Sequence, residues 1–258
     1  MNRIDKEFEI LKKENKKALV PFVTFDKLTK EELAKLIIDI REAGANIVEI
    51  GVPFSEPLAD GEIIQKAYTN ALNRGIAIKD IFNTVEIIRE ECEIPIVVMV
   101  YYNLVYCYGI EKFLNKAKEV GIDGLIIPDL PLEERKEVLN ECIERNIYLI
   151  PLVAPTSKDR IKKIIENGDG FIYCISSMGI TGERSEILNK STINYLNYVK
   201  EERNKPFLVG FGISNSKIAK EVCKYCDGVI VGSSVVKRIS NNTVIEFIKE
   251  IRREIDLE

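Results

Sequence analysis

The sequence contains no histidine. This absence removes the most common general base and the Ser-His and Cys-His nucleophile pairs, so acid–base chemistry falls to carboxylates, tyrosine, lysine or cysteine. A zinc site would have to be built from cysteine and carboxylate ligands alone. The CxxC motif from Cys223 to Cys226 has no second pair to complete such a site. We therefore expect neither a metal nor a cofactor of the chain's own.

Long runs of one residue class are also missing. No apolar stretch reaches 18 residues, so we expect no membrane span, and residues 1–17 are too charged for a signal peptide. The formal net charge is −4 and there is no long Lys/Arg run, which argues against a nucleic-acid surface. Six cysteines without a secretion signal are typical of reduced thiols, so we expect a cytoplasmic protein.

Short apolar segments rich in β-branched residues alternate with helical patterns along the whole chain. This alternation predicts a parallel sheet covered by helices, and the number of units and the chain length fit one (β/α)8 TIM barrel over residues 1–258. A doubly wound open sheet is the alternative. An extra N-terminal helix is predicted, with Ile4, Phe8 and Leu11 on one side. The expected strands lie at 19–25, 47–52, 95–101, 123–129, 147–154, 170–176, 206–212 and 227–233.

Loop lengths indicate where a site would lie. The predicted helix-to-strand connections are short, whereas the strand-to-helix connections at 52–60 and 176–190 are long. Loops of this length are commonly functional, and barrel enzymes build their active sites at the C-terminal ends of the strands. Loop 176–190 suits a lid with hinges at Gly179 and Gly182, although a plain surface excursion is the alternative.

Two carboxylates border the first of these loops. Glu49 stands between Val48 and Ile50 in a predicted strand, so it points either into the barrel mouth or toward the helices, where an unpaired charge is costly. A salt bridge to a barrel Lys or Arg is the alternative, although the predicted strands contain neither residue. Asp60 fits either a site carboxylate or the N-cap of the helix that follows it.

The last two predicted strands end in glycine-rich segments, GFGIS at 210–214 and VGSS at 231–234. Glycines allow an anion to approach backbone N–H groups, and barrels commonly hold phosphate at these two loops. This pattern indicates a phosphorylated ligand, with tight turns as the alternative. Tyr173, just before loop 176–190, is either a core aromatic or a pocket wall with its hydroxyl near the reacting centre.

Several segments together resemble the α subunit of tryptophan synthase, in the same order and over nearly the whole chain. The resemblance implies a retro-aldol lyase that splits indole-3-glycerol phosphate into indole and glyceraldehyde 3-phosphate. It also implies an α2β2 complex in which the indole passes to a β subunit that carries pyridoxal phosphate. The segments are PFVTFD (21–26), VEIGVPFSEPLADG (48–61), YYNLVYCYGIEKF (101–113), GLIIPDLPLEE (124–134), YCISSMGITG (173–182), GFGIS (210–214) and VGSSVVK (231–237).

The resemblance also assigns roles to residues. It makes Glu49 the catalytic acid/base, Asp60 the carboxylate that binds the indole N–H, and Tyr173 an active-site tyrosine. It places Asp129 near the mobile loops. The implied substrate- and phosphate-binding positions are Phe22 on the indole wall, Thr181 and Gly182 in the mobile loop, and Phe211, Gly212, Gly232 and Ser233 around the phosphate.

The chain departs from the family pattern at positions that face the lid and the partner. It has Phe25-Asp26-Lys27 where Gly-Asp-Pro is usual, Ser55-Glu56-Pro57 where Ser-Asp-Pro is common, and Ser177-Met178 where an arginine is common. These departures leave room for a stand-alone lyase that releases free indole. A non-catalytic regulatory subunit and another phosphosugar barrel, such as a ribulose-phosphate epimerase, are two further hypotheses.

Loop 52–60 also predicts a partner surface. Its apolar residues Pro53, Phe54, Pro57 and Leu58 are hard to justify on a solvated loop, and prolines stiffen it. Exposed apolar groups on a rigid mount suit a protein interface. We expect a partner that presses on this loop to adjust the two carboxylates beside it.

Overall fold

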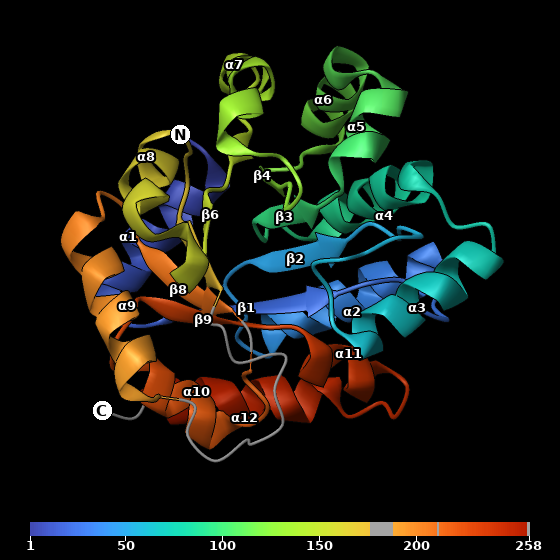
Figure 1. The fold of residues 1–258 in the computed structure, drawn as a ribbon. Helices are drawn as coiled ribbons and strands as arrows, with labels where there is room; N and C mark the ends of the chain where they lie inside the picture. Colours follow the sequence, from blue (N-terminus) through green and yellow to red (C-terminus); the bar gives the residue numbers. More distant parts are fainter. Residues whose placement is uncertain (176–187, 211, 257–258) are drawn as a thin grey trace.

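Parallel strands and helices alternate along the chain in the computed structural model, which describes residues 1–175, 188–210 and 212–256. The strands run from residue 18 to residue 231, and the helices surround them (Figure 1). The strands are β1 (Ala18–Val23), β2 (Val48–Gly51), β3 (Ile96–Met99), β4 (Gly124–Ile126), β5 (Tyr148–Leu149), β6 (Leu152–Val153), β7 (Ile172–Ile175), β8 (Phe207–Gly210) and β9 (Gly228–Val231).

The helices fill the connections between strands. Their termini follow sequence signals, as in α2, where Thr29 and Glu32 form a capping box. The α-helices are α1 (Arg3–Glu14), α2 (Lys30–Glu42), α3 (Glu62–Asn73), α4 (Ile78–Glu91), α5 (Tyr102–Tyr108), α6 (Ile110–Val120), α7 (Arg135–Glu144), α8 (Ile161–Glu166), α9 (Lys190–Glu202), α10 (Ser216–Cys223), α11 (Ser233–Ile239) and α12 (Val244–Asp256). Two 3-10 helices precede α7 and α8, η1 (Leu132–Glu134) and η2 (Pro155–Arg160).

The strands close into a ring through one interrupted strand. Their order is β5-β4-β3-β2-β1-β9-β8-β7-β6, and all pairs are parallel. β5 and β6 lie at the two ends of this order, yet only Ile150 and Pro151 separate them in the chain. They are two halves of the strand expected at 147–154, broken where Pro151 lacks an N–H. The predicted (β/α)8 barrel is confirmed.

Two apolar cores lie on the two sides of the strand ring. The larger packs the outward side chains of the strands against the helices. The smaller fills the barrel interior, where Val20, Val97 and Leu208 from three different strands belong to one cluster. This alternation is the one expected for a barrel filled by side chains.

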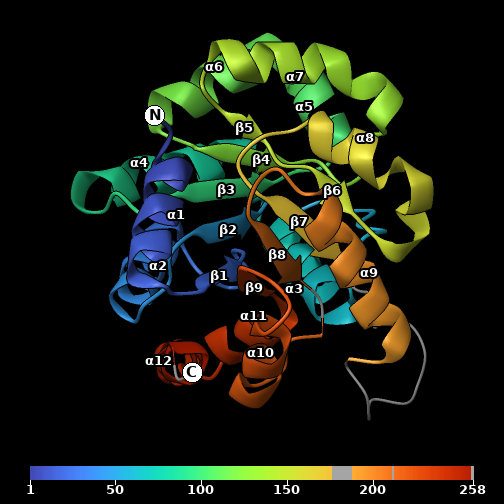
Figure 2. The same cartoon turned by 90° about the vertical axis from the view of Figure 1, so that its left-hand side faces the viewer.

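The extra N-terminal helix is confirmed, and it adds to the interior core. Ile4 and Leu11 of α1 are buried within the interior cluster, and Phe8 packs against it. Asn2 caps α1 by accepting from the Ile4 N–H at 2.9 Å, and its amide donates to the Asp123 carbonyl at 2.9 Å. Figure 2 shows α1 beside α2, to which the Glu7–Arg41 ion pair links it at 2.8 Å.

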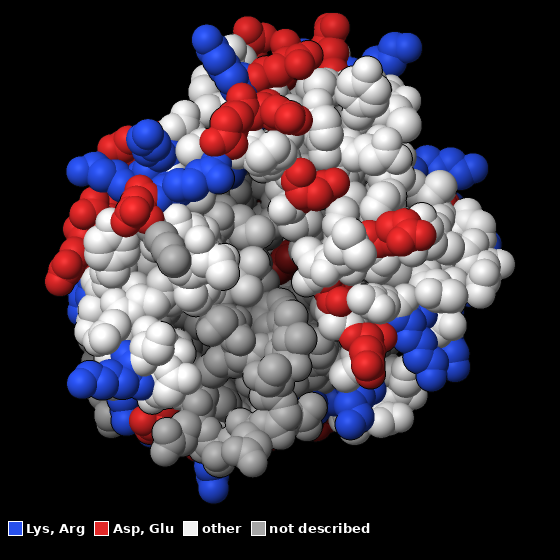
Figure 3. All heavy atoms as spheres, in the orientation of Figure 1, with Lys and Arg blue, Asp and Glu red and all other residues white. Residues whose placement is uncertain are grey.

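A long loop follows the C-terminal end of β2. The connection from β2 to α3 spans residues 52–61, so the long loop expected at 52–60 is present. The surface on the face shown in Figure 3 is hollowed near its centre, and an acidic side chain lies inside the hollow. Among the described helices none is long and apolar enough to cross a membrane.

Candidate active site

Glu49 points into the barrel. It pairs in register with Phe22 of β1 and Val97 of β3, and both of these residues belong to the interior cluster. Its neighbours Val48 and Ile50 belong to the outer core instead. The alternation of a β-strand therefore sends the carboxyl group inward, as expected from the cost of burying an unpaired charge against the helices.

The Glu49 carboxyl group is buried without a partner. Its residue is 1% exposed, and neither carboxyl oxygen has a hydrogen-bond partner within residues 1–175, 188–210 and 212–256. Burial, followed by the charge of Asp60, raises the pKa of Glu49 to about 8. The alternative of a structural salt bridge is wrong for the described chain. At neutral pH the group is an acid that holds its proton.

Asp60 is held by a tyrosine from the next strand unit. The Tyr101 hydroxyl donates to Asp60 Oδ2 at 2.8 Å and accepts from the Ala59 N–H at 3.1 Å. The ring of Tyr101 stacks on Phe54, with centroids 4.6 Å apart. Tyr101, two residues beyond the end of β3, therefore holds loop 52–60 through contacts with Phe54, Ala59 and Asp60.

Asp60 does not cap α3. The N-cap residue is Gly61, which has no side chain to offer, and the Asp60 carboxylate accepts from Tyr101 instead. Burial raises the pKa of Asp60 to about 6, and the hydrogen bond from Tyr101 opposes that rise. Near neutral pH Asp60 is mostly ionised, while Glu49 is mostly protonated. The two carboxyls therefore carry different charges in one site.

Phe22 and Tyr173 form part of the wall around these carboxyls. Phe22 is buried beside Glu49, and its ring packs so closely on Gly51 that a methyl group there would clash with it. Tyr173 lies across Gly210 of β8 with equally little space, 2.5 Å from its hydroxyl to such a methyl group. Burial, and then the charges of Glu49 and Asp60, raise the pKa of Tyr173 well above its usual value. Its hydroxyl therefore lies near both acids.

Two residues of the site were missed by sequence reasoning, Tyr101 and Tyr68. Tyr68 of α3 is fully buried, its hydroxyl has no partner among the described residues, and a methyl group on Gly51 would clash with that hydroxyl. Burial and the charges of Asp60 and Glu49 raise the pKa of Tyr68. Tyr101 had a signal, because it ends a predicted strand at 95–101. Tyr68 had none, since its helical spacing is that of any core residue.

The glycine-rich ends of β8 and β9 meet on the same side of the ring. Gly212 has a φ of +79°, which favours glycine, and Gly232 is the N-cap of α11, which begins at Ser233. The Ser234 hydroxyl donates to the Ile213 carbonyl at 3.0 Å and ties the two loops together. A methyl group on Gly232 would lie 3.9 Å from Cβ of Phe22, so this end of the site adjoins the wall beside Glu49.

Three predicted site residues, Thr181, Gly182 and Phe211, lie outside the described residues. The lid predicted for loop 176–190 also lies outside them over residues 176–187. Asp129 is described, and its Oδ1 accepts from the Tyr102 N–H at 2.8 Å. This bond places the Asp129 carboxylate beside the first residue of α5, which follows Tyr101 in the chain. Asp129 therefore supports the backbone next to Tyr101, the residue that holds Asp60.

The cysteines take no part in this arrangement. All six are free thiols, and both cysteines of the CxxC motif are buried, Cys223 as the last residue of α10 and Cys226 just after it. No cluster of three or more potential metal ligands occurs within the described ranges. What the site offers is a proton on Glu49, a negative charge on Asp60 and two neighbouring loops that carry Gly212 and Gly232.

Comparisons with known proteins agree with this architecture. The family model described as tryptophan synthase alpha chain matches residues 8–255. The chain belongs to this family. A tryptophan synthase alpha chain from Clostridium beijerinckii is 53% identical over 254 residues, which cover 97% of this chain and 98% of that protein.

Solved structures of the family share the fold. Tryptophan synthase subunit alpha from Legionella pneumophila superposes with a TM-score of 0.91 at 31% identity, covering 99% of both chains. A structure described as the tryptophan synthase a2b2 complex from Pyrococcus furiosus gives a TM-score of 0.85 at 33% identity, covering 92% of this chain and 98% of that one. The resemblance read from the sequence is therefore confirmed at the level of family and fold.

Proposed function

We propose that the chain catalyses the retro-aldol cleavage of indole-3-glycerol phosphate to indole and glyceraldehyde 3-phosphate. The observation that carries the proposal is the buried, unpartnered Glu49, whose pKa is raised to about 8 beside an Asp60 whose pKa is about 6. A carboxyl that keeps its proton near neutral pH is a general acid, and its ionised neighbour stabilises positive charge. Family membership supports the same reaction.

The chemistry requires both groups. Indole leaves only after its C3 is protonated, and Glu49 supplies that proton from the barrel interior. Protonation creates a positive indolenine, whose N–H faces the Asp60 carboxylate held by Tyr101. Glu49, now ionised, accepts the proton of the glycerol hydroxyl as the carbon–carbon bond breaks. The charge pair with Asp60 forms only during the reaction, so it lowers the barrier rather than strengthening ground-state binding.

The phosphate is proposed to bind between the ends of β8 and β9. Gly212 and Gly232 lack side chains that would block their backbone N–H groups, and Ser233 opens α11. The proposed contacts of Phe211, Thr181 and Gly182 complete this end of the site by family resemblance. Phe22 and Tyr173 are proposed to enclose the indole ring between the phosphate and the carboxyls.

An assay of indole release tests the reaction directly. The parent chain should release indole from indole-3-glycerol phosphate, and Asp60→Asn should slow release by roughly 10²–10³, because an amide cannot neutralise the indolenine. Tyr101→Phe keeps the ring on Phe54 but removes the hydroxyl, so a smaller loss is expected. Asp60→Asn with an unchanged rate and a lowered melting temperature would make Asp60 a structural residue and remove it from the mechanism.

We also propose a β subunit as the partner in an α2β2 assembly, which would consume the indole with its own pyridoxal phosphate. The Pyrococcus furiosus structure is of an a2b2 complex. Leu58 at the tip of loop 52–60 is 91% exposed, and Tyr106 of α5 is 67% exposed. Exposed apolar groups beside the mouth of a site suit an interface. The Ala59 N–H donates to the Tyr101 hydroxyl, which in turn donates to Asp60. A partner that displaces Leu58 would therefore also move the group that holds the Asp60 carboxylate.

The structure corrects one detail of the expected partner surface. Pro53 and Pro57 are buried and Phe54 is half-buried, with its ring stacked on Tyr101, so Leu58 is the one of these four apolar residues that faces outward. A charge at Phe54 would therefore disturb the bond between Tyr101 and Asp60 as well as any interface. Leu58 is the cleaner position for a test.

Titration with a purified β subunit should raise the rate of indole formation at least about tenfold, which is about 1.4 kcal/mol of barrier. Leu58→Asp should weaken both association and stimulation without changing the basal rate. Ile10→Asp, on the exposed side of α1 near the other end of the barrel, is the matched control and should change neither. A flat titration with no complex on size-exclusion chromatography would favour a stand-alone lyase.

A further inference from the structure

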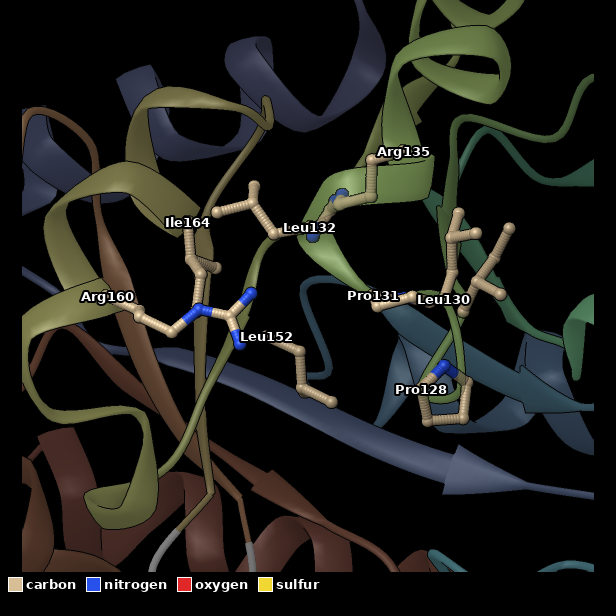
Figure 4. A pocket seen from close by; sticks show the side chains of 9 residues that line it. Pro128, Leu130, Pro131, Leu132, Arg135, Leu152, Arg160 and Ile164 are labelled. Atoms are coloured by element: carbon tan, nitrogen blue, oxygen red, sulfur yellow. The ribbon is translucent and has the colours of Figure 1, made fainter.

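A cavity lies between the loops that follow β4 and β6. Its volume is about 160 Å³, and it is lined by residues of the β4–η1 segment, the start of α7, β6, η2 and α8 (Figure 4). Figure 4 shows the side chains of Arg135 and Arg160 directed toward this cavity from two different elements. The mechanism proposed above uses neither arginine.

Arg135 is a buried cation without a counter-ion. It is 7% exposed, and it forms no ion pair with any described carboxylate. Its Nη2 donates at 3.2 Å to the carbonyls of Leu149 and Ile150, where the strand is broken, but its Nε is buried with no partner in the described chain. Burial lowers the pKa of Arg135 to about 10. Burying a charge costs several kcal/mol unless it is paired, so this guanidinium favours an anion beside it.

Arg160 adds a second positive group from the other side. It pairs with Glu133 at 2.6 Å, but the Glu133 side chain is 69% exposed and does not line the cavity. Among the lining residues that the structure describes, none is acidic. An anion inside would thus meet the unpaired guanidinium of Arg135 and that of Arg160, whose Nη2 is already shared with the exposed Glu133 carboxylate. A guanidinium group pairs well with a carboxylate through two parallel bonds.

The rest of the lining is apolar, made of proline and branched aliphatic side chains such as Pro128, Leu132, Leu152 and Ile164. A cavity of about 150 Å³ lined by apolar groups holds a benzene ring. We propose that this cavity binds a small amphipathic monocarboxylate, with its carboxylate on Arg135 and Arg160 and a single ring or branched alkyl group against Leu132 and Ile164. It adjoins the site at Glu49, because Leu152 pairs in register with Tyr173, and both side chains pack against the interior cluster.

The probe for this proposal is benzoate, added to the full chain and followed by calorimetry and by the chain's melting temperature. Binding with a dissociation constant of about 1 mM is expected for a ligand of this size. Benzamide has the same shape without the charge, and acetate has the charge without the ring, so each should bind at least roughly tenfold more weakly. Glycerol phosphate, directed at the ends of β8 and β9, should not compete with benzoate.

Variants separate the two halves of the proposed site. Arg135→Met keeps much of the side-chain volume and removes the charge, so it should weaken benzoate binding at least roughly tenfold. Arg160→Gln should weaken it by a smaller factor, because Arg160 is more exposed. Ile164→Phe fills the apolar end and leaves both arginines, so it should also abolish binding. It serves as the second test if Arg135→Met fails to fold.

Glu49→Gln should bind benzoate like the parent chain, so this result does not depend on the lyase reaction. The proposal is overturned if benzoate gives no heat and no melting shift at roughly tenfold above the expected dissociation constant. It is equally overturned if benzamide matches benzoate, or if a folded Arg135→Met or Ile164→Phe variant binds as well as the parent. Competition by glycerol phosphate would assign benzoate to the lyase site instead.

Discussion

Glu49→Gln should lower the rate of indole formation by at least about 10²–10⁴, and by more if one group serves both proton transfers. The amide keeps the shape of the side chain but has no proton of suitable acidity to deliver to C3, and it cannot accept one from the glycerol hydroxyl. Substrate affinity should stay within a few-fold, because the proposed phosphate and ring contacts lie on other residues. The measurement is the turnover number and KM for indole-3-glycerol phosphate.

The matched control is Glu42→Gln, the same chemical change at the exposed end of α2. It should leave turnover and KM unchanged. Glu49→Gln with near-parental turnover would remove Glu49 from the mechanism. A loss confined to KM would mean that the carboxyl binds substrate rather than transferring a proton.

The direction of Glu49 could be predicted from the sequence because strand alternation leaves two choices, and the cost of a buried charge decides between them. The side chain between Val48 and Ile50 faces either the helices or the interior, and an unpaired charge against the helices is costly, so the interior was expected. The structure places Glu49 inward and its two neighbours in the outer core. The barrel followed from the alternation of apolar strands and helical segments for the same reason. Local periodicity fixes which side of an element is buried.

Contacts between distant residues were not readable in this way. Nothing in the spacing of Tyr101 and Asp60 announces their hydrogen bond, because it depends on how a long loop folds back onto the end of β3. Phe54 was expected to be exposed, but the same folding stacks it on Tyr101. Nothing in the sequence distinguishes Arg135 from the other charged residues of its helical segment. Its burial follows from the break between β5 and β6, whose carbonyls it contacts.

The raised pKa of Glu49 predicts a large pH dependence of stability, separate from catalysis. The carboxyl has a pKa of about 8 in the folded chain, against 4.5 as its ordinary value. Below about pH 4.5 both states hold the proton, and the group contributes no pH-dependent difference. As the pH rises toward 8 the unfolded chain releases the proton while the folded chain keeps it, so the folded state loses stability. Above about pH 8 the loss is complete.

Glu49→Gln lacks this titration, so its free energy of unfolding relative to the parent should increase between about pH 5 and pH 8.5. The expected slope is about 1.4 kcal/mol per pH unit, and the full change is on the order of 4 kcal/mol. Urea unfolding at several pH values measures the difference in free energy of unfolding between the variant and the parent chain. The test is how this difference changes with pH, because the effect of burying an amide is the same at every pH. Glu42→Gln should run parallel to the parent. If Glu49→Gln also runs parallel, Glu49 is ionised at neutral pH in the folded chain and cannot be the acid that protonates indole.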